Sequence, residues 1–525
     1  MKRIFLSLLL ALSSLSPLPL RAAQPEAVKS SALDCATLVY ALPGVRFMQK
    51  LRPAKGAARV AEVRNLPEGL GWNARRSLVE GYVTEPGTYR YLAVVEEEDG
   101  RRTEEPVTLV CSAELPQPTP FMGLLTWNAF ENTISADKVY AIADAMVEYG
   151  LRDAGYTYLC LDDQWAERER NAEGRLACSR EKFPQGFHVL ADYVHARGMK
   201  FGIYSNGGTR TCSDAQPGSW QHEDVDAKDF VDWGFDLLKY DYCFNPGTSA
   251  EMAQEVYRAM GQALAKHAPK RFLYYICEWG HRNPWEWGAE VGGSCWRATD
   301  DTRDSWVNPK YKGGVMENLE IFKRIWPYNG VNRWNDADML MCGLHGQGKS
   351  SNAGTDGRGM TMDEYRTQFA LWCMWSSPLT LAFDITALGG KPGVSGVQNP
   401  YYAEDLALIT NKHLIALNQD RLGQSAEPIY DTAEHVVFMK DLENGDVALS
   451  VTNLDSASTQ RVTLDLADFP AFDESATYRP LNCWTGEQLG GRYSTKKSLV
   501  VEVAPHATEV YRFLRQRKMP KARLR

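Results

Sequence analysis

One short stretch, FDLLKYDYC at Phe235–Cys243, ends an apolar run with a cation and a carboxylate. Residues two apart in a strand share a face, so Lys239 and Asp241 are expected to project together from the end of a strand. A neighbouring cation lowers the pKa of a carboxylate and keeps it ionised, as a nucleophile requires. The alternative is an ordinary ion pair at a strand end, which is the commoner case for such a stretch taken alone.

Acidic residues recur at other strand ends of a predicted barrel. After the Pro-rich ELPQPTP, predicted strands alternate with amphipathic helical stretches, as in repeated βα units. The predicted strands are Gly123–Asn128, Tyr156–Asp163, Lys200–Ser205, Leu237–Cys243, Phe272–Trp279, Ser294–Asp301, Arg333–Leu340 and Pro378–Asp384. Helices are predicted at Ala136–Tyr149, Ala250–His267 and Met362–Trp375. Eight strands over about 290 residues predict an α/β fold, a (β/α)8 TIM barrel.

The carboxyl ends of barrel strands meet at one mouth, where active sites lie. The acidic residues at these ends are Asp162, Asp163, Asp241, Glu278, Asp300, Asp301, Asp336 and Asp338. They occupy five of the eight strand ends, more than solubility alone requires, because loops can also carry charge. The clustering therefore favours a functional carboxylate site.

Three kinds of site fit such a mouth. Carboxylates bind hard cations such as magnesium, two carboxylates flanking an anomeric carbon hydrolyse glycosides, and a mouth lacking one catalytic carboxylate binds sugar without cleaving it. Interleaved tryptophans favour a ring-stacked organic ligand over a cation; they are Trp127, Trp165, Trp279, Trp296 and Trp334. With nine histidines and no CxxC or HExxH motif, neither a zinc site nor another metal or cofactor is expected.

Eight motifs in consistent order resemble glycoside hydrolase family 27, which comprises mainly α-galactosidases, or melibiases. They are TPFMGLLTWNAF, AGYTYLCLDDQW, GIYSNGGTRTC, DLLKYDYC, CEWG, CWRATDDTRDSW, RWNDADML and GMTMDEYRTQFALW, and the likeness runs from about Thr119 through Asp420. The resemblance implies a retaining mechanism with a covalent glycosyl-enzyme intermediate. It implies Asp241 as nucleophile and Asp301 as acid/base, with Asp301 preferred over the adjacent Asp300 because Arg297 stands four residues before it.

The resemblance also implies the residues that bind galactose. Asp162 and Asp163 accept hydrogen bonds from the 4- and 6-hydroxyls, and Trp127 covers the apolar face of the sugar. Lys239 and Arg297 hold the 3- and 2-hydroxyl side.

Other residues at the mouth are expected to shape the site or to pack beneath it. Tyr204 faces the mouth, with plain barrel packing as an equal alternative. Glu278 closes the space at C2 and favours galactose over N-acetylgalactosamine. Asp338 supports the site without reacting, and Trp165, Trp296 and Trp334 are expected to pack.

The reading adopted is an exported, retaining exo-α-galactosidase that needs no cofactor and acts on oligosaccharides or glycans. Two alternatives stay open: a β-L-arabinopyranosidase of the same family, because L-arabinopyranose is galactose without C6, and a non-catalytic galactoside-binding protein. We expect Lys239 to keep Asp241 anionic. We expect burial and neighbouring carboxylates to raise the pKa of Asp301, so that it holds its proton.

Five segments are predicted along the chain: a signal peptide (1–23), a β module (30–112), the catalytic barrel (118–411), a C-terminal antiparallel β-sandwich (412–515) and a basic tail (516–525). The β module resembles immunoglobulin-like modules, and either binds glycans or is a spacer packed against the barrel. In the C-terminal region Asn444-Gly445 predicts a two-residue hairpin turn.

Composition limits partners and location. A net charge of −8 gives no support to a nucleic-acid partner, and no later stretch is apolar enough for a membrane span. The leader predicts export to the periplasm or beyond, where the eleven cysteines can form disulfides. We expect Cys35–Cys111 and Cys212–Cys243 to pair, and leave the pairing of Cys277 with Cys295 open. The glycine-rich Cys342–Gly359 is either an idle surface loop or a rim element that shapes access for the leaving group.

Overall fold

The computed structural model describes residues 31–54, 57–268, 272–348, 355 and 357–516, and its centre is a closed parallel β-barrel. The sheet order β14-β13-β12-β11-β10-β9-β8-β15 is closed by a parallel bridge between Leu340 and Leu381. The strands are β8 (Met122–Leu125), β9 (Tyr158–Cys160), β10 (Lys200–Asn206), β11 (Leu237–Asp241), β12 (Leu273–Ile276), β13 (Cys295–Arg297), β14 (Trp334–Asp336) and β15 (Leu379–Leu381). All eight predicted barrel strands are confirmed; seven are shorter than predicted, and β10 extends one residue further, to Asn206.

Strand β11 shows why these sequences form barrel strands. All five of its residues are buried, because helices cover the outside of a parallel barrel and side chains fill the inside. Leu238 and Tyr240 share the outward face, where the Tyr240 ring lies 5.9 Å from that of Tyr257 on the covering helix. Lys239 and Asp241 therefore face the interior together.

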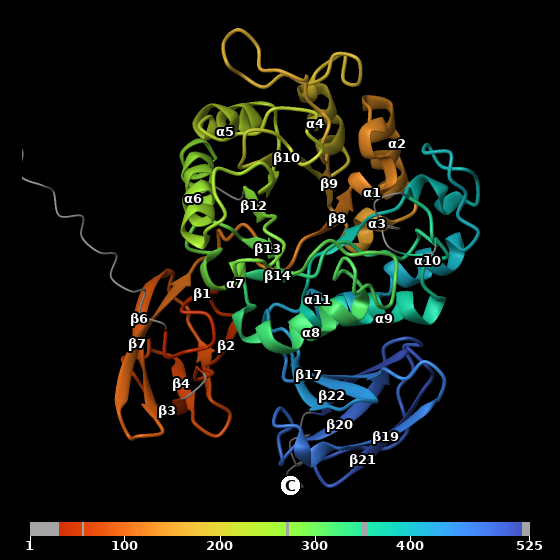
Figure 1. The fold of residues 1–525 in the computed structure, drawn as a ribbon. Coiled ribbons are helices and arrows are strands. Elements are labelled where there is room, and N and C mark those ends of the chain that lie inside the picture. Colours follow the sequence, from red (N-terminus) through yellow and green to blue (C-terminus); the bar gives the residue numbers. More distant parts are fainter. Residues whose placement is uncertain (1–30, 55–56, 269–271, 349–354, 356, 517–525) are drawn as a thin grey trace, which may run out of the picture.

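Helices surround the barrel (Figure 1). The α-helices are α1 (Trp127–Phe130), α2 (Ala136–Glu148), α3 (Leu151–Ala154), α4 (Phe187–Ala196), α5 (Glu223–Asp232), α6 (Ala250–His267), α7 (Pro284–Trp287), α8 (Val315–Ile325), α9 (Met362–Trp375), α10 (Tyr402–Ile409) and α11 (Lys412–Asn418). Short 3-10 turns are η1 (Glu131–Thr133), η2 (Trp326–Tyr328), η3 (Ile385–Gly389) and η4 (Leu466–Asp468).

Capping residues set the ends of two of the predicted helices. The Ser249 side chain accepts a hydrogen bond from the Met252 amide at the start of α6, and Thr361 and Glu364 form a capping box at the start of α9. Helices α6 and α9 have the predicted bounds, and α2 ends one residue earlier than predicted.

The N-terminal module contains a four-stranded sheet, β1-β7-β6-β3, and a three-stranded sheet, β2-β5-β4, around its own hydrophobic core. Its strands are β1 (Leu38–Ala41), β2 (Arg46–Lys50), β3 (Ala57–Arg64), β4 (Leu70–Asn73), β5 (Leu78–Tyr82), β6 (Gly87–Glu97) and β7 (Arg102–Cys111). The module packs on the barrel: Arg333 donates to the Leu38 carbonyl at 2.8 Å, and the Tyr328 hydroxyl donates to Asp34 at 2.9 Å. These contacts show that the module is packed against the barrel, as the spacer interpretation requires.

The C-terminal region is an antiparallel β-sandwich, made of sheets β16-β17-β18-β22-β20 and β19-β21. Its strands are β16 (Glu427–Asp431), β17 (His435–Asp441), β18 (Val447–Asn453), β19 (Gln460–Asp465), β20 (Thr477–Asn482), β21 (Ser498–Val503) and β22 (Thr508–Gln516). The predicted β17–β18 hairpin forms, but its turn is longer than two residues. The Gly445 amide bonds to the Leu442 carbonyl with Gly445 at φ 84°, which gives a three-residue turn with a bulge.

The predicted Cys35–Cys111 disulfide is wrong, since both thiols are free and buried. Strands β1 and β7 run parallel, with Leu38 beside Thr108 and Ala41 beside Cys111. Cys35 precedes Leu38, which already lies about 10 Å along the strand from the level of Cys111. That offset exceeds what a disulfide spans, about 7 Å between Cα atoms.

The predicted Cys212–Cys243 disulfide forms. Cys277 and Cys295, whose pairing was left open, are both free thiols.

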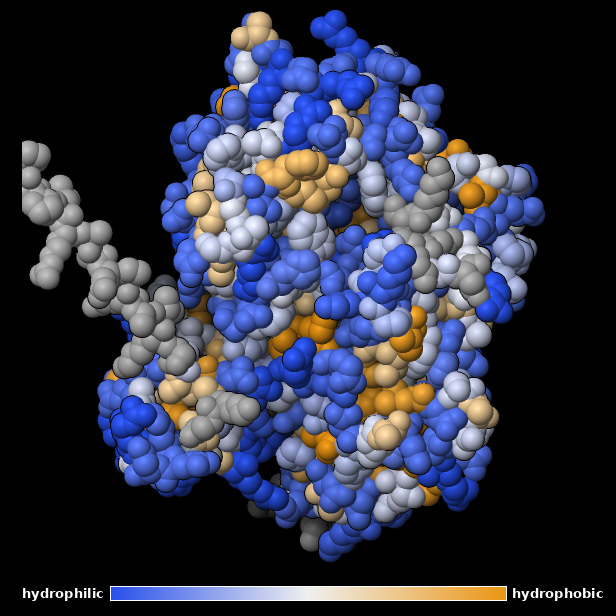
Figure 2. All heavy atoms as spheres, viewed as in Figure 1, coloured by the Kyte–Doolittle hydropathy of each residue, from blue (hydrophilic) through white to orange (hydrophobic). Residues whose placement is uncertain are grey.

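On the face shown in Figure 2 most surface side chains are hydrophilic, and hydrophobic ones gather where the barrel meets the two β regions. No helix in the described part of the chain is long and apolar enough to cross a membrane. The predicted signal peptide lies outside the described residues, as do all but the first residue of the predicted basic tail and part of the Cys342–Gly359 loop.

Candidate active site

A cavity of about 530 Å³ opens at the carboxyl ends of the barrel strands. It brings together eight of the nine predicted site residues: Trp127, Asp162, Asp163, Tyr204, Lys239, Asp241, Arg297 and Asp301. They come from the ends of β8 to β11 and β13 and the residues that follow. The predicted Glu278 is not part of this cavity wall.

Asp241 is buried at the end of β11 and held on both carboxylate oxygens. Its Oδ1 accepts a hydrogen bond from the Tyr242 amide at 2.9 Å, and its Oδ2 accepts one from the Tyr204 hydroxyl at 3.1 Å. Tyr204 is thus a partner of the predicted nucleophile, and not only a packing residue. The arrangement fixes the direction in which the carboxylate faces the cavity.

The sequence indicated that Lys239, the cation of β11, would pair with Asp241, but the two do not form an ion pair. Lys239 Nζ instead lies 2.7 Å from Asp162 Oδ2, in a buried ion pair between β11 and the loop after β9. Asp162 also accepts a hydrogen bond from the Asp163 amide at 2.9 Å. Lys239 acts on Asp241 at longer range, through its charge.

Asp163 lies on the same wall. Its Oδ2 accepts a hydrogen bond from the Ser213 amide at 2.9 Å, and its Oδ1 accepts one from the Gln164 amide at 2.7 Å. Burial raises the pKa of Asp163. Two adjacent carboxylates fixed in this way present oxygen acceptors to a polyhydroxylated ligand.

Asp301 lies at the rim, in the loop after β13, with about half of its side chain exposed (51%). Arg297 lies 3.2 Å from Asp301 Oδ1, and Arg303 lies 3.6 Å from Oδ2. Arg297 also pairs with Asp338 at 3.0 Å, which agrees with the supporting role predicted for Asp338. The neighbouring Asp300 pairs with His281 at 2.7 Å.

The pKa values of the two candidate catalytic carboxyls are shifted in the directions opposite to those expected from the sequence. Burial raises the pKa of Asp241 to about 7, although Lys239 opposes the shift. Partial desolvation of Asp301 in the cavity acts to raise its pKa, but Arg297 and Arg303 outweigh this effect and hold the pKa below its usual value. Asp301 is among the charges that raise the pKa of Asp241, so the two carboxyls form an interacting pair.

Glu278 faces away from the cavity, which corrects the prediction that it contacts the ligand. Its side chain is fully buried, accepts a hydrogen bond from the Arg282 amide at 3.0 Å and pairs with the Arg282 guanidinium. The residue before it, Cys277, lines the cavity, with its thiol 3.9 Å from an Arg297 nitrogen. Trp279 lines the cavity as well.

The register between β11 and β12 explains why Cys277 lines the cavity and Glu278 does not. Knowledge of this register is the signal that would have identified Cys277 as a cavity residue. Lys239 pairs with Tyr275 across the β11–β12 ladder, so two residues further on Asp241 is level with Cys277. Alternation then places Tyr275 and Cys277 on the inner face and Glu278 on the outer one. Other cavity residues that the sequence argument did not assign to ligand binding are Asn128, Ser213, His281, Thr302, Arg303, Tyr311 and Met339.

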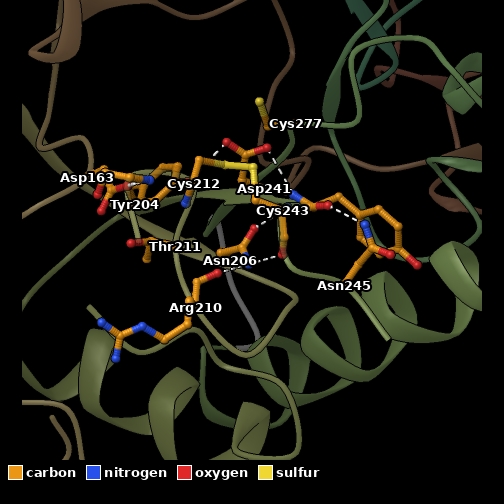
Figure 3. Close-up of a disulfide and its surroundings, with 12 residues drawn as sticks. Asp163, Tyr204, Asn206, Arg210, Thr211, Cys212, Asp241, Cys243, Asn245 and Cys277 are labelled. Carbon is orange, nitrogen blue, oxygen red and sulfur yellow. Dashed lines mark hydrogen bonds between the residues drawn. A yellow bond between two sulfur atoms is a disulfide. The ribbon is translucent and has the colours of Figure 1, made fainter. Parts of the chain in front are cut away.

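The Cys212–Cys243 disulfide lies directly beside Asp241, with Cys277 near the same carboxylate (Figure 3). Cys212, Cys243 and Asp241 are close enough to hold a metal ion. Both sulfurs are already bonded to each other, however, so they supply no thiolate ligands. The disulfide instead ties the loop after β10 to the end of β11.

The remaining tryptophans behave as predicted. Trp165, Trp296 and Trp334 are fully buried, and each donates its indole N–H to an oxygen inside the protein. Trp127 and Trp279 keep part of their surface open and line the cavity. A pocket with carboxylates and open aromatic rings suits a sugar, which is apolar on one face and hydroxylated at its edges.

Comparisons with known proteins agree with this site. A family model described as "Alpha galactosidase A" matches residues 119–420, and one described as "Alpha galactosidase C-terminal beta sandwich domain" matches residues 432–513. "Alpha-galactosidase 2" of Arabidopsis thaliana is 34% identical over 399 residues, which cover 76% of this chain and 90% of that protein. "Alpha-galactosidase A" of Cellvibrio japonicus is 34% identical over 407 residues, 75% of this chain and 91% of that protein.

Solved structures extend the likeness to the fold. The crystal structure of alpha-galactosidase I from Mortierella vinacea superposes with a TM-score of 0.66 at 29% identity, covering 77% of this chain and 98% of that one. A crystal structure of a Bacteroides fragilis protein superposes with a TM-score of 0.68 at 33% identity. This superposition covers 91% of this chain and 96% of the Bacteroides fragilis chain, so it extends beyond the two domains that the family models match.

Proposed function

This chain belongs to the alpha galactosidase A family and is a glycoside hydrolase that releases α-galactosyl residues; we propose that Asp241 and Asp301 perform this reaction by a retaining mechanism. The observation that carries the proposal is one cavity holding a buried carboxylate fixed on both oxygens and a second carboxylate at its rim. Two carboxyl groups on one cavity are the machinery of glycoside hydrolysis, and the retaining course is the one that the family resemblance implies.

The reaction proceeds in two steps. Asp241 attacks the anomeric carbon as the bond to the leaving oxygen breaks, and Asp301 gives its proton to that oxygen. Asp301, now a carboxylate, takes a proton from water, whose oxygen attacks the same carbon and displaces Asp241. Two inversions leave an α-galactose product, and both carboxyls return to their starting states.

The interacting carboxyl pair needs a single proton between them to react. With burial raising the pKa of Asp241 and the arginines lowering that of Asp301, the free enzyme keeps this proton mostly on Asp241. The reactive form, with the proton on Asp301, differs by the position of that same proton. Both forms carry one proton on the carboxyl pair. They are therefore populated over the same pH range, which is the range in which the enzyme is active.

Galactose fits the remaining wall by charge and shape. Asp162 and Asp163 offer carboxylate oxygens that suit an axial 4-hydroxyl and a 6-hydroxyl, and Trp127 offers a ring for the apolar face of the sugar. A sugar without the matching hydroxyl leaves these buried acceptors unpaired, which costs binding. Arg297 lies beside Cys277 on the cavity wall, and the family resemblance assigns Arg297 to the 2-hydroxyl side of the sugar.

A panel of substrates and an NMR measurement test the proposal. The purified enzyme is assayed on p-nitrophenyl α-galactoside, β-L-arabinopyranoside and α-N-acetylgalactosaminide. We expect the galactoside to lead in kcat/KM by at least about tenfold over each, because the other two lose or crowd polar contacts. Proton NMR of the first product should show α-galactose. A lead for the arabinopyranoside, or β-galactose as the first product, contradicts the proposal.

Export is the second part of the proposal. The predicted leader and the Cys212–Cys243 disulfide support a location where thiols oxidise, the periplasm or the exterior. Cell fractionation followed by mass spectrometry of the isolated protein tests it. Recovery of the full-length chain with a reduced Cys212 from the cytoplasm contradicts export.

A further inference from the structure

The loop that carries Asp301 runs from β13 to α8 over residues 298–314. Its first part is fixed from inside the barrel, since the Thr302 amide donates to Asp338 Oδ2 at 2.7 Å. The Asp301 side chain is half-exposed, and its ion pairs are with the two arginine side chains described above. Its position therefore depends on what holds the loop that follows it.

Asp304 fixes the middle of the loop. Its buried carboxylate accepts hydrogen bonds from the Gly346 amide at 2.8 Å, the Met360 amide at 3.2 Å and the Tyr365 hydroxyl at 2.8 Å. Tyr365 lies near the start of α9. The position of the loop that carries Asp301 therefore depends on where the first turn of α9 lies.

Trp306, two residues further, is held from a different domain. Its ring stacks on the His506 ring with centroids 4.3 Å apart and planes 19° from parallel. His506 lies in the turn between β21 and β22, in the C-terminal sandwich. This stack joins the sandwich directly to the loop that carries Asp301.

His506 is itself held firmly against α9. Its Nδ1 lies 2.6 Å from Glu364 Oε1, and its carbonyl accepts a hydrogen bond from the Thr367 hydroxyl at 2.7 Å. The other oxygen of Glu364 caps the helix by accepting from the Thr361 amide at 2.8 Å. His506 has φ 55°, a left-handed conformation that costs energy in a residue other than glycine and is retained only where surrounding contacts impose it.

We propose that His506 is a positioning residue for catalysis, through which the C-terminal β-sandwich holds Trp306, and with it the acid/base Asp301, in place. The inference rests on the proposed role of Asp301. It gives the sandwich a part in the reaction although none of its described residues lines the catalytic cavity. The stack is the direct link, and the Glu364 contact sets the orientation of the imidazole ring.

The test compares leaving groups in the full-length His506→Ala enzyme. Poor leaving groups need protonation by Asp301 and nitrophenol hardly does, so loosening the loop should act selectively. We expect kcat/KM on melibiose to fall about tenfold, and on p-nitrophenyl α-galactoside by less than about threefold, since small misplacements of a catalytic group are costly. Partial unfolding would lower both rates equally and leave their ratio unchanged.

Two further variants separate stacking from a general effect. His506→Phe keeps an aromatic ring against Trp306 and should recover most of the melibiose activity. His435→Ala makes the same deletion in the same sandwich, at the start of β17 and away from the loop, and should leave the ratio unchanged. A His506→Phe enzyme as impaired as His506→Ala, or a wild-type ratio in His506→Ala, overturns the proposal.

Hydrogen exchange gives a readout that does not need activity. In His506→Ala the amides of residues 301–314 should exchange faster than in the wild type, while those of α6 stay unchanged. Unchanged exchange in 301–314 overturns the inference, even if hydrolysis proceeds as proposed. If the wild type fails to cleave either galactoside, the proposed function fails instead, and the exchange result still decides whether His506 holds the loop.

Discussion

The Tyr204 hydroxyl donates a hydrogen bond to Oδ2 of Asp241 at 3.1 Å, from the neighbouring strand of the barrel. A donor to a carboxylate stabilises its anionic form, and this one also fixes the direction of attack. Tyr204→Phe removes the donor and keeps the ring. We expect kcat/KM on p-nitrophenyl α-galactoside to fall by about tenfold or more, the value of one charged hydrogen bond. A change below twofold would leave Tyr204 with a packing role only.

The pH dependence of kcat/KM follows from the carboxyl pair. Above about pH 7 Asp241 loses its proton, both carboxyls are anionic, and no acid remains for the leaving group, so the rate falls as pH rises. At low pH both are protonated and no anion remains to attack. Because Arg297 and Arg303 lower the pKa of Asp301, this acid limb should lie below the usual range of an aspartic acid. A profile of kcat/KM against pH checks both limbs. A value of kcat/KM that still rises above pH 8 would contradict the account.

The rim carboxylate should show its role through the leaving group. Asp301→Ala removes the acid, so melibiose and raffinose should lose far more activity than an activated aryl galactoside. Asp300→Ala is the matched control, because Asp300 is the neighbouring carboxylate in the same loop and is paired with His281. Equal losses on both substrate types in Asp301→Ala, with a selective loss in Asp300→Ala, would move the acid/base role to Asp300.

Glu278 should affect stability and leave substrate choice nearly unchanged. Glu278→Gln leaves the Arg282 guanidinium facing a neutral amide in a buried site, and removing one partner of such a pair costs about 3 kcal/mol. We expect a lower Tm in thermal denaturation, with kcat/KM on α-galactosides within about threefold of wild type. An unchanged Tm with a tenfold loss of kcat/KM would return Glu278 to the ligand site.

The sequence allowed the barrel and most of its mouth to be predicted, because both follow from local patterns. Apolar runs ending in acidic residues marked the strands, and the helical stretch Met362–Trp375 marked α9. Alternation along β11 was enough to place Lys239 and Asp241 together on the inner face.

Three features could not be read in the same way, since each depends on tertiary packing. Spacing alone does not tell which carboxylate Lys239 meets, and the partner is Asp162, from a strand two positions away in the barrel. Cys277 and Glu278 are adjacent, and only the β11–β12 register decides which of them faces the ligand. The parallel pairing of β1 with β7, which separates Cys35 from Cys111, has no local signal.

The account depends most on Asp241 as the nucleophile, and an azide experiment on the Asp241→Ala enzyme tests this directly. Without the carboxylate, turnover of p-nitrophenyl α-galactoside should drop by at least about a thousandfold, the scale of covalent catalysis. Azide can then enter the vacated space and attack the anomeric carbon from the same side, while Asp301 stays in place. We predict renewed release of nitrophenol and a β-galactosyl azide product, identified by NMR. Retention of more than about a thousandth of the wild-type rate without azide, or an α-galactosyl azide product, would contradict the assignment.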